Sequence, residues 1–196
     1  PFVVKINANA PLNTAIQFRI LFQDGTYNDF QFYSQTVNVD YLNITINDVF
    51  TTNSSKGRIC YNGEDQTEGL GFDYNSDGTM TYETGFMVGI NNSVSDNVRG
   101  ATAGLTDSDF QAQVTIQKND PGQWSDFDTY GTFSDATNPS PINVDVNYRS
   151  MSWTPTPFSK FHIFEYTIHN TGGTALNNLY AGVFSDWDIQ TYANNK

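Results

Sequence analysis

Apolar and polar residues alternate along much of this chain. In residues 15–20 (AIQFRI) and 29–37 (DFQFYSQTV), apolar side chains occupy nearly every second position, and similar short segments recur about every ten residues. Successive side chains of a strand point to opposite faces, so this period indicates β-strands with one buried side. No stretch of a dozen residues shows the three- and four-residue spacing of an amphipathic helix. The pattern predicts an all-β fold of antiparallel strands.

The first forty residues predict a smaller unit than the rest of the chain. An Asp-Gly pair at 24–25 closes a hairpin between the two alternating segments, and residues 1–6 predict one further strand. Because three strands are too few for a free-standing sandwich, we interpret residues 1–40 as the C-terminal part of an immunoglobulin-like β-sandwich. The alternation restarts at Tyr41, so we expect residues 41–196 to form a larger antiparallel β-sandwich, incomplete at its C-terminus.

Polar and turn-forming residues separate the strands that we predict in the larger sandwich. The polar run at 51–57 and the long polar connection at 91–109 are expected to be loops. The predicted strands are residues 42–46, 58–61, 70–74, 79–90, 110–117, 130–133, 142–153, 161–169 and 179–189.

Charge and composition restrict the partners of the chain. Nine basic and 21 acidic residues give a net charge of −12, which does not suit a partner that carries many phosphates. We therefore expect no nucleic acid partner. The longest apolar stretches, such as residues 18–22, are far shorter than the roughly 20 residues that cross a bilayer as a helix, so we expect no membrane insertion.

Cys60 is the one cysteine of the chain. A single cysteine cannot form an internal disulfide framework, and without neighbouring His and Cys residues it does not indicate a zinc site. Flanked by Ile59 and Tyr61, it is interpreted as a small buried apolar residue.

Five short strings resemble one family of extracellular sequences. They are YTIHNTG at 166–172, LYAGVFSDWDI at 179–189, GRICYN at 57–62, GLGF at 69–72 and YETGFMVG at 82–89. Together they resemble the β-rich accessory region that follows the catalytic domain in large secreted subtilisin-like peptidases of Bacteroidota and occurs in related surface proteins. Cys60 departs from the pattern, because that region more often has a small residue there.

The resemblance spans about residues 42–190 and implies a large multidomain parent protein. It implies export by a type IX secretion system, with display at the cell surface or release from it. Expected partners are the other domains of the parent chain and the secretion or outer-membrane machinery. No peptidase nucleophile motif and no sorting domain are found in the 196 residues.

Few residues could form a catalytic group. His162 and His169 lie seven apart on one predicted strand, so they face opposite sides and sit about 23 Å apart. A glycosidase pair would need two nearby carboxyls. Asp186 and Asp188, on one face of a predicted strand, have a possible separation, and Glu165, one strand away, could sit near them. We expect Trp187 to point into the core, and we expect no catalysis in this segment.

Two groups of oxygen-bearing residues predict metal sites. Asp73, Asn75 and Asp77 copy the first half of a D-x-N-x-D-G calcium loop, although its twelfth position is Thr84 instead of Glu. A plain Asn/Asp/Gly hairpin turn explains the same letters. Asp186 and Asp188 share one face of a predicted strand, about 6.6 Å apart at the backbone, and form a second cation candidate. Ca²⁺ is the cofactor that either group would hold.

Aromatic residues in polar segments offer a different function. Trp124, Phe127, Tyr130 and Trp153 could form a platform on which sugar rings stack, although packing into the core explains them as well. The leading interpretation is a non-catalytic structural or accessory β-sandwich segment of a large secreted or cell-surface protein. The alternative is an extracellular glycan-binding module.

Overall fold

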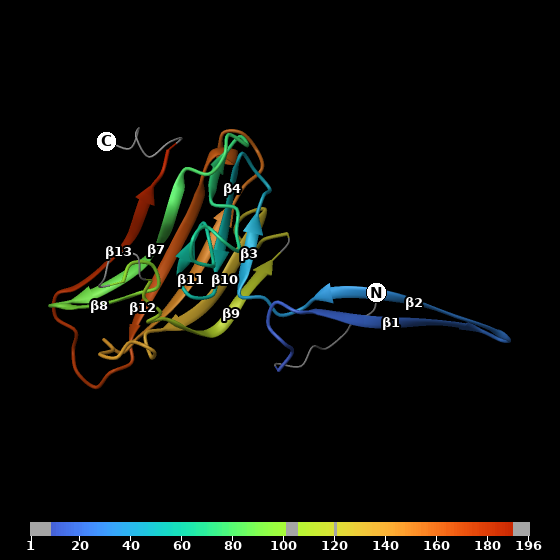
Figure 1. Ribbon diagram of the computed structural model, residues 1–196, viewed down its shortest axis with the longest axis horizontal. Helices are drawn as coiled ribbons and strands as arrows, with labels where there is room; N and C mark the ends of the chain where they lie inside the picture. The colour runs from blue at the N-terminus through green and yellow to red at the C-terminus, as the bar shows by residue number, and fades with distance from the viewer. Residues whose placement is uncertain (1–8, 101–105, 120, 190–196) are drawn as a thin grey trace. The chain divides into compact units, whose positions relative to one another are not determined.

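The computed structural model describes residues 9–100, 106–119 and 121–189 (Figure 1). The chain divides into two compact units, Pro1–Asp40 and Tyr41–Lys196. All strand pairings in the described residues are antiparallel, which confirms the predicted all-β fold. The described part of the chain contains no helix long and apolar enough to cross a membrane.

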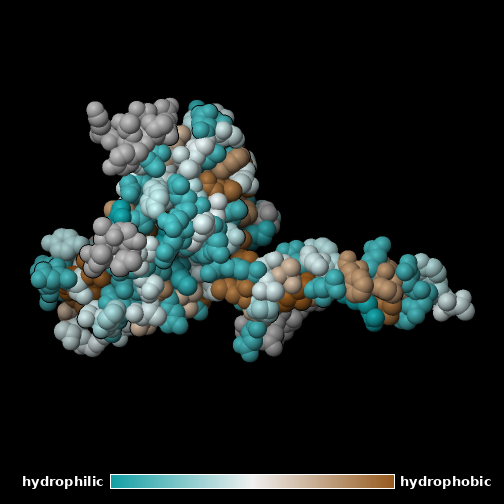
Figure 2. All heavy atoms as spheres, in the orientation of Figure 1, coloured by the Kyte–Doolittle hydropathy of each residue, from teal (hydrophilic) through white to brown (hydrophobic). Residues whose placement is uncertain are grey.

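The first unit contains a hairpin of two ten-residue strands, β1 (Ala15–Asp24) and β2 (Tyr27–Thr36). Gly25 adopts a φ of 57° at its tip, a backbone conformation that glycine tolerates without strain. Apolar side chains of both strands are exposed, among them Phe22, Phe30 and Phe32. Figure 2 shows hydrophobic surface, in brown, along this hairpin. The predicted strand at residues 1–6 lies outside the described residues, and membership of an immunoglobulin-like domain stays a prediction.

The second unit is a β-sandwich of two sheets (Figure 1). One sheet has the order β13-β7-β5-β4-β3, with β6 paired to β4 and β8 to β7. The other has the order β12-β11-β10-β9. The strands of the seven-stranded sheet are β3 (Tyr41–Ile44), β4 (Val49–Ser54), β5 (Arg58–Ile59), β6 (Phe72–Tyr74), β7 (Thr81–Ile90), β8 (Ser93–Asp96) and β13 (Leu179–Trp187). Those of the four-stranded sheet are β9 (Gln111–Asn119), β10 (Phe127–Ser134), β11 (Val144–Ser152) and β12 (His162–Asn170), with a short 3₁₀ helix, η1 (Phe158–Lys160), before β12.

Aromatic rings fill the space between the two sheets. Phe86 of β7 stacks on Tyr166 of β12 with ring centroids 4.4 Å apart, and it meets Phe133 of β10 edge-on at 5.9 Å. Phe133 in turn contacts Phe110 and Tyr148. Burial of such rings is the main favourable contribution to folding, and their edge-on and offset contacts add specificity.

Only the end of the polar run at 51–57 is the loop that its composition predicts, because residues 55–57 form a turn. Residues 51–54 belong to β4 and are buried. Asn53 donates to Thr129 Oγ1 on the opposite sheet (2.9 Å), and Thr52 donates to the Asn43 side chain on the neighbouring strand β3 (2.7 Å). Buried polar groups are tolerated when they are hydrogen-bonded, which is why hydropathy alone does not find this strand.

Two further expectations about single elements were tested. The polar connection at 91–109 contains a strand, β8, which pairs with β7 across a turn at Asn91 and Asn92. Cys60 is buried, as predicted, and burial raises the pKa of its thiol.

Candidate functional site

Side chains from all four strands of the β9–β12 sheet line up on its outer face. The register pairs Gln117 with Tyr130, Tyr130 with Arg149, and Arg149 with Glu165. These four residues form one row across the sheet, here called the Arg149 row. Because neighbouring strands lie about 4.8 Å apart, the row crosses about 14 Å of surface.

A second row lies beside the first, two residues along strands β10, β11 and β12. It consists of Val114, Thr132, Asn147 and Thr167, and is called the Asn147 row. Strand β9 has an irregular register between its pairs with Tyr130 and Thr132, so Val114 and Gln117 both reach the outer face. Thr132 donates a hydrogen bond to Asn147 Oδ1 (2.9 Å), which aligns the amide of the second row.

The loop before β10 carries Trp124 and is held by a buried carboxylate. Asp128 is 0% exposed and accepts hydrogen bonds from the backbone N–H groups of Gln123 (2.6 Å) and Trp124 (3.0 Å). It also accepts one from the hydroxyl of Ser125. The loop is thereby fixed, while the side chain of Trp124 stays 50% exposed.

Arg149 connects Trp124 to the sheet. Its guanidinium carbon lies 4.4 Å from the centroid of the Trp124 ring, within the range of a cation–π interaction. Its Nη2 atom donates to Glu165 Oε2 at 2.9 Å. Its Nε atom is buried and has no hydrogen-bond partner in the structure. The ring is therefore positioned both from the loop and from the sheet.

Trp124, the Asn147 row and the Arg149 row apart from Gln117 line a cleft of about 470 Å³, a size within the usual range of small-molecule sites. Its walls combine two exposed aromatic rings, an ion pair, an amide and two threonine hydroxyls. The cleft residues are Val114, Trp124, Tyr130, Gly131, Thr132, Asn147, Tyr148, Arg149, Glu165 and Thr167. Such a surface can stack a planar or ring-shaped ligand and exchange hydrogen bonds with its polar groups.

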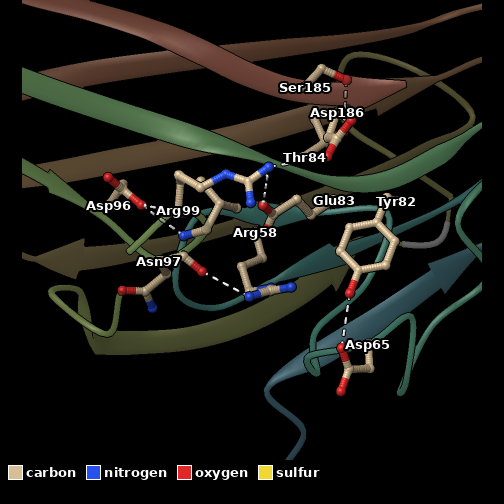
Figure 3. Close-up of polar contacts among 11 residues, drawn as sticks. Arg58, Asp65, Tyr82, Glu83, Thr84, Asp96, Asn97, Arg99, Ser185 and Asp186 are labelled. Carbon is tan, nitrogen blue, oxygen red and sulfur yellow. Dashed lines mark hydrogen bonds and ion pairs between the residues drawn. The ribbon is translucent and has the colours of Figure 1, made fainter. Parts of the chain in front are cut away.

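Arg58 lies buried on the other sheet, in a polar network (Figure 3). Its guanidinium donates to three backbone carbonyls, those of Tyr61 (3.3 Å), Gly63 (3.0 Å) and Asn97 (2.8 Å). Tyr61 and Gly63 lie in the loop after β5 and Asn97 follows β8, so Arg58 ties these two segments together. Burial lowers the pKa of Arg58, and nearby acidic groups, Glu83 first, oppose that shift.

Arg99 bridges two carboxylates beside this network. Its Nη2 atom lies 3.3 Å from Glu83 Oε1 and 3.1 Å from Asp186 Oδ2. Glu83 and Asp186 face each other across β7 and β13, so the arginine neutralises a pair of like charges. Burial raises the pKa of Glu83, and the positive charges of Arg99 and Arg58 lower it in part.

A small polar cavity of about 70 Å³ adjoins these arginines. Tyr82, at its wall, donates a hydrogen bond to Asp65 Oδ1 at 2.9 Å (Figure 3). Both arginines of this region are bonded to protein groups. The network therefore acts as an internal brace in this structure.

The predicted calcium residues lie in a tight hairpin turn. Asn75 and Ser76 have φ values of 57° and 62°, and Asp77 N donates to Tyr74 O at 3.3 Å, as in a type I′ turn. Asp73 Oδ1 accepts from the backbone N–H of Gly78 (3.2 Å). The turn explains these residue types, and calcium binding by Asp73, Asn75 and Asp77 stays a prediction.

Of the carboxylates considered for a glycosidase site, the structure separates Glu165 from Asp186. Asp186 lies on β13 and bonds Arg99, whereas Glu165 lies on β12 of the opposite sheet and bonds Arg149. Their strands are not neighbours. The backbone N–H of Asp188 donates to Met80 O (2.8 Å). Within the described ranges, no group of three or more His, Cys, Asp or Glu side chains is placed to hold a metal.

The histidines and Trp187 also have defined places. His162 is largely buried and lies 2.6 Å from Ser152 Oγ and 2.8 Å from Val49 O, while His169 is exposed on the other face of β12. Burial lowers the pKa of His162. Trp187 is 49% exposed, so its expected place in the core is wrong. It lies on the edge strand β13, where its ring meets that of Phe72 edge-on with centroids 5.8 Å apart.

Of the four aromatic residues considered as a platform, two come together. Trp124 and Tyr130 line the cleft, whereas Phe127 is buried and Trp153 packs on Phe161. The sequence reasoning missed Arg149 and Asn147, which line the cleft together with the two rings. The alternating pattern of β11 places both on the outer face, but only the strand register shows which residues they meet.

Comparisons with known proteins leave the family open. Neither the protein-family models, nor the curated proteins, nor the solved structures yield a match to this chain.

Proposed function

We propose that this chain is a non-catalytic accessory segment of a large secreted or cell-surface multidomain protein. The role of the segment would be to space, stabilise or dock other domains of its parent. The resembling strings support a subtilisin-like serine peptidase as that parent, with export by a type IX system. They lie largely on framework elements of the sandwich, including β5, β7, β12 and β13.

The observation that carries the proposal is that two buried carboxylates, Asp135 and Asp128, are bonded to backbone groups of the fold. Asp135 accepts from the backbone N–H groups of Ile142, Asn143 and Val144 and from the hydroxyl of Ser95. Asp128 braces the Trp124 loop in the same way. Carboxylates surrounded by several donors hold a fold together.

An activity assay tests the non-catalytic role. The purified chain is incubated with casein and with nitrophenyl glycosides, and Asp186→Asn and Glu165→Gln variants are assayed beside it. We expect no product above the buffer rate from any of the proteins. Hydrolysis by the native chain that either variant abolishes would contradict the proposal and assign an enzyme.

The identity of the parent protein is tested by sequencing its gene. Sequencing the coding region on both sides of residues 1–196 is expected to show a subtilisin-like catalytic domain upstream and a sorting domain downstream. A reading frame that contains neither would contradict the proposed parent.

A second candidate function is glycan binding, and the cleft on the β9–β12 sheet favours it. Trp124 and Tyr130 present aromatic surface, while Asn147 and Glu165 present polar groups between and beside the rings. A glycan could be a partner of the segment without any change to its accessory role.

A further inference from the structure

We propose that the cleft on the outer face of the β9–β12 sheet is a binding site for a neutral oligosaccharide, with Trp124 as its stacking platform. This inference rests on the second candidate function and specifies its site and ligand class. It is independent of the identity of the parent protein.

The first argument is the way in which Trp124 is held. A fully buried carboxylate, Asp128, fixes the backbone of the loop at Gln123 and Trp124. A second anchor joins the loop to β11, because Ser125 Oγ accepts from Ser152 N (3.0 Å) and Asp126 N donates to Ser152 O (3.0 Å). The chain thus rigidly positions a large ring that remains half exposed. Pre-positioned aromatic surface lowers the entropic cost of binding a ligand.

The second argument is the support beneath the ring. Arg149 lies against Trp124 at 4.4 Å and is itself held by Glu165 at 2.9 Å. With the guanidinium against the indole, the exposed part of the ring is left for the ligand. Glu165 is therefore a positioning residue, which acts on the platform through Arg149.

The polar groups of the cleft suit hydroxyl-bearing ligands. Thr132, Asn147 and Thr167 offer hydroxyl and amide groups in one row, and each of these groups can make more than one hydrogen bond. Tyr130 lies in the neighbouring row, paired with Arg149. A pyranose chain combines an apolar ring face for stacking with a rim of hydroxyls, and it matches both features of the cleft.

The charges of the site favour a neutral ligand. The positive charge of Arg149 is balanced by Glu165, and the chain carries a net charge of −12. An anionic polysaccharide would be repelled by the net negative charge of the chain, and the positive charge of Arg149 is already paired with Glu165. A peptide that binds by strand addition needs a sheet edge, whereas the cleft lies on the face of the sheet.

Calorimetric titration tests the site with cello-, xylo-, manno-, laminari- and maltohexaose as probes. Polygalacturonate and an extended neutral peptide are titrated as well. We expect at least one neutral hexasaccharide to bind with a Kd of about 1 mM or tighter. Trp124→Ala is expected to weaken that binding at least about tenfold.

Trp187→Ala is the matched control, because Trp187 is equally exposed but lies on the other sheet. We expect it to leave the Kd within about twofold. Glu165→Gln is expected to weaken binding about threefold to tenfold and to shift the fluorescence emission of Trp124, compared in a background that carries Trp153→Phe and Trp187→Phe. A merely structural role of Glu165 elsewhere would leave that emission unchanged.

Three results would overturn the proposal, each at a different level. Hexasaccharide binding that Trp124→Ala leaves intact would remove this site but keep glycan binding. Preference for polygalacturonate or for the peptide would reject the ligand class. No binding to any probe at about 10 mM would reject the site and the second candidate function together, while the proposed accessory role would stand on its own tests.

Discussion

At the scale of single residues, charged side chains in this protein mainly hold loops in place. Arg58, Asp128 and Asp135 each make three or more hydrogen bonds, chiefly to backbone groups. The bonded backbone groups lie in loops or at strand ends. Few apolar side chains are available in those loops, so buried ionic groups provide the order that packing provides elsewhere.

Replacing Arg58 tests this role. In Arg58→Met, the carbonyls of Tyr61, Gly63 and Asn97 lose a charged donor and remain buried. We expect a loss of about 2–4 kcal/mol in the free energy of unfolding, measured by urea denaturation. Lys56→Met, which removes an exposed charge nearby, is expected to cost less than about 0.5 kcal/mol. Equal losses of unfolding free energy in the two variants would contradict the proposed role of Arg58 in holding the loops.

Burial of Glu83 predicts that the stability of the fold depends on pH. Because burial raises its pKa above the ordinary value of 4.5, the folded chain binds this proton more tightly than the unfolded chain. The stability from this group is present below the ordinary pKa and is lost as the pH rises through the raised pKa. Glu83→Gln removes this dependence, so the stability of the variant relative to the native chain should increase from about pH 4 to about pH 7.

Urea denaturation at the two pH values measures this difference. Glu64→Gln removes a negative charge from an exposed side chain on the same small cavity and serves as the control. A relative stability of Glu83→Gln that is constant or falls with rising pH would show that burial does not control Glu83.

At the scale of elements, strands are set by alternation and turns by local chemistry. The hairpin at 15–36 and strands β7, β11, β12 and β13 could be predicted, because apolar and polar residues alternate there and Gly, Asn or Asp close the turns. Strand β4 could not, because residues 51–54 are threonine, asparagine and serine that are nevertheless buried. Thr52 bonds Asn43 on the neighbouring strand β3, and Asn53 bonds Thr129 on the opposite sheet. Strand β8 (SVSD) could not be predicted either, because most of its residues are polar.

The turn at 75–76 gives a prediction at this scale. Ser76 has a φ of 62°, which is unfavourable for a residue with a Cβ atom and easily adopted by glycine. Ser76→Gly is therefore expected to raise the free energy of unfolding by about 0.5–1 kcal/mol, measured by thermal denaturation. Ser76→Val should lower it. A lower melting temperature for Ser76→Gly would show that the side chain has a role beyond the turn.

Calcium binding at the same turn is tested separately. If Asp73, Asn75 and Asp77 hold Ca²⁺, millimolar calcium should raise the melting temperature of the native chain but not that of Asp73→Asn. No shift in the native chain would remove the calcium prediction.

At the scale of the whole molecule, the two sheets of the larger unit have different uses. The seven-stranded sheet contains the Arg58 and Arg99 networks, and the four-stranded sheet presents the cleft. The sequence indicated the aromatic residues of the cleft but not their partners. Arg149 meets Trp124 across a loop and Glu165 across a strand pair, and such contacts depend on register, which alternation leaves undetermined.

The most direct test of the binding cleft is a map of the ligand on the protein. Backbone amide NMR spectra of the ¹⁵N-labelled chain are recorded while the best-binding neutral hexasaccharide is added. We predict that the shifted resonances belong to residues 121–126 and to the outer-face rows of β9, β10, β11 and β12, with the indole N–H of Trp124 among them. Shifts confined to the seven-stranded sheet, or no shifts at saturating sugar, would contradict the account.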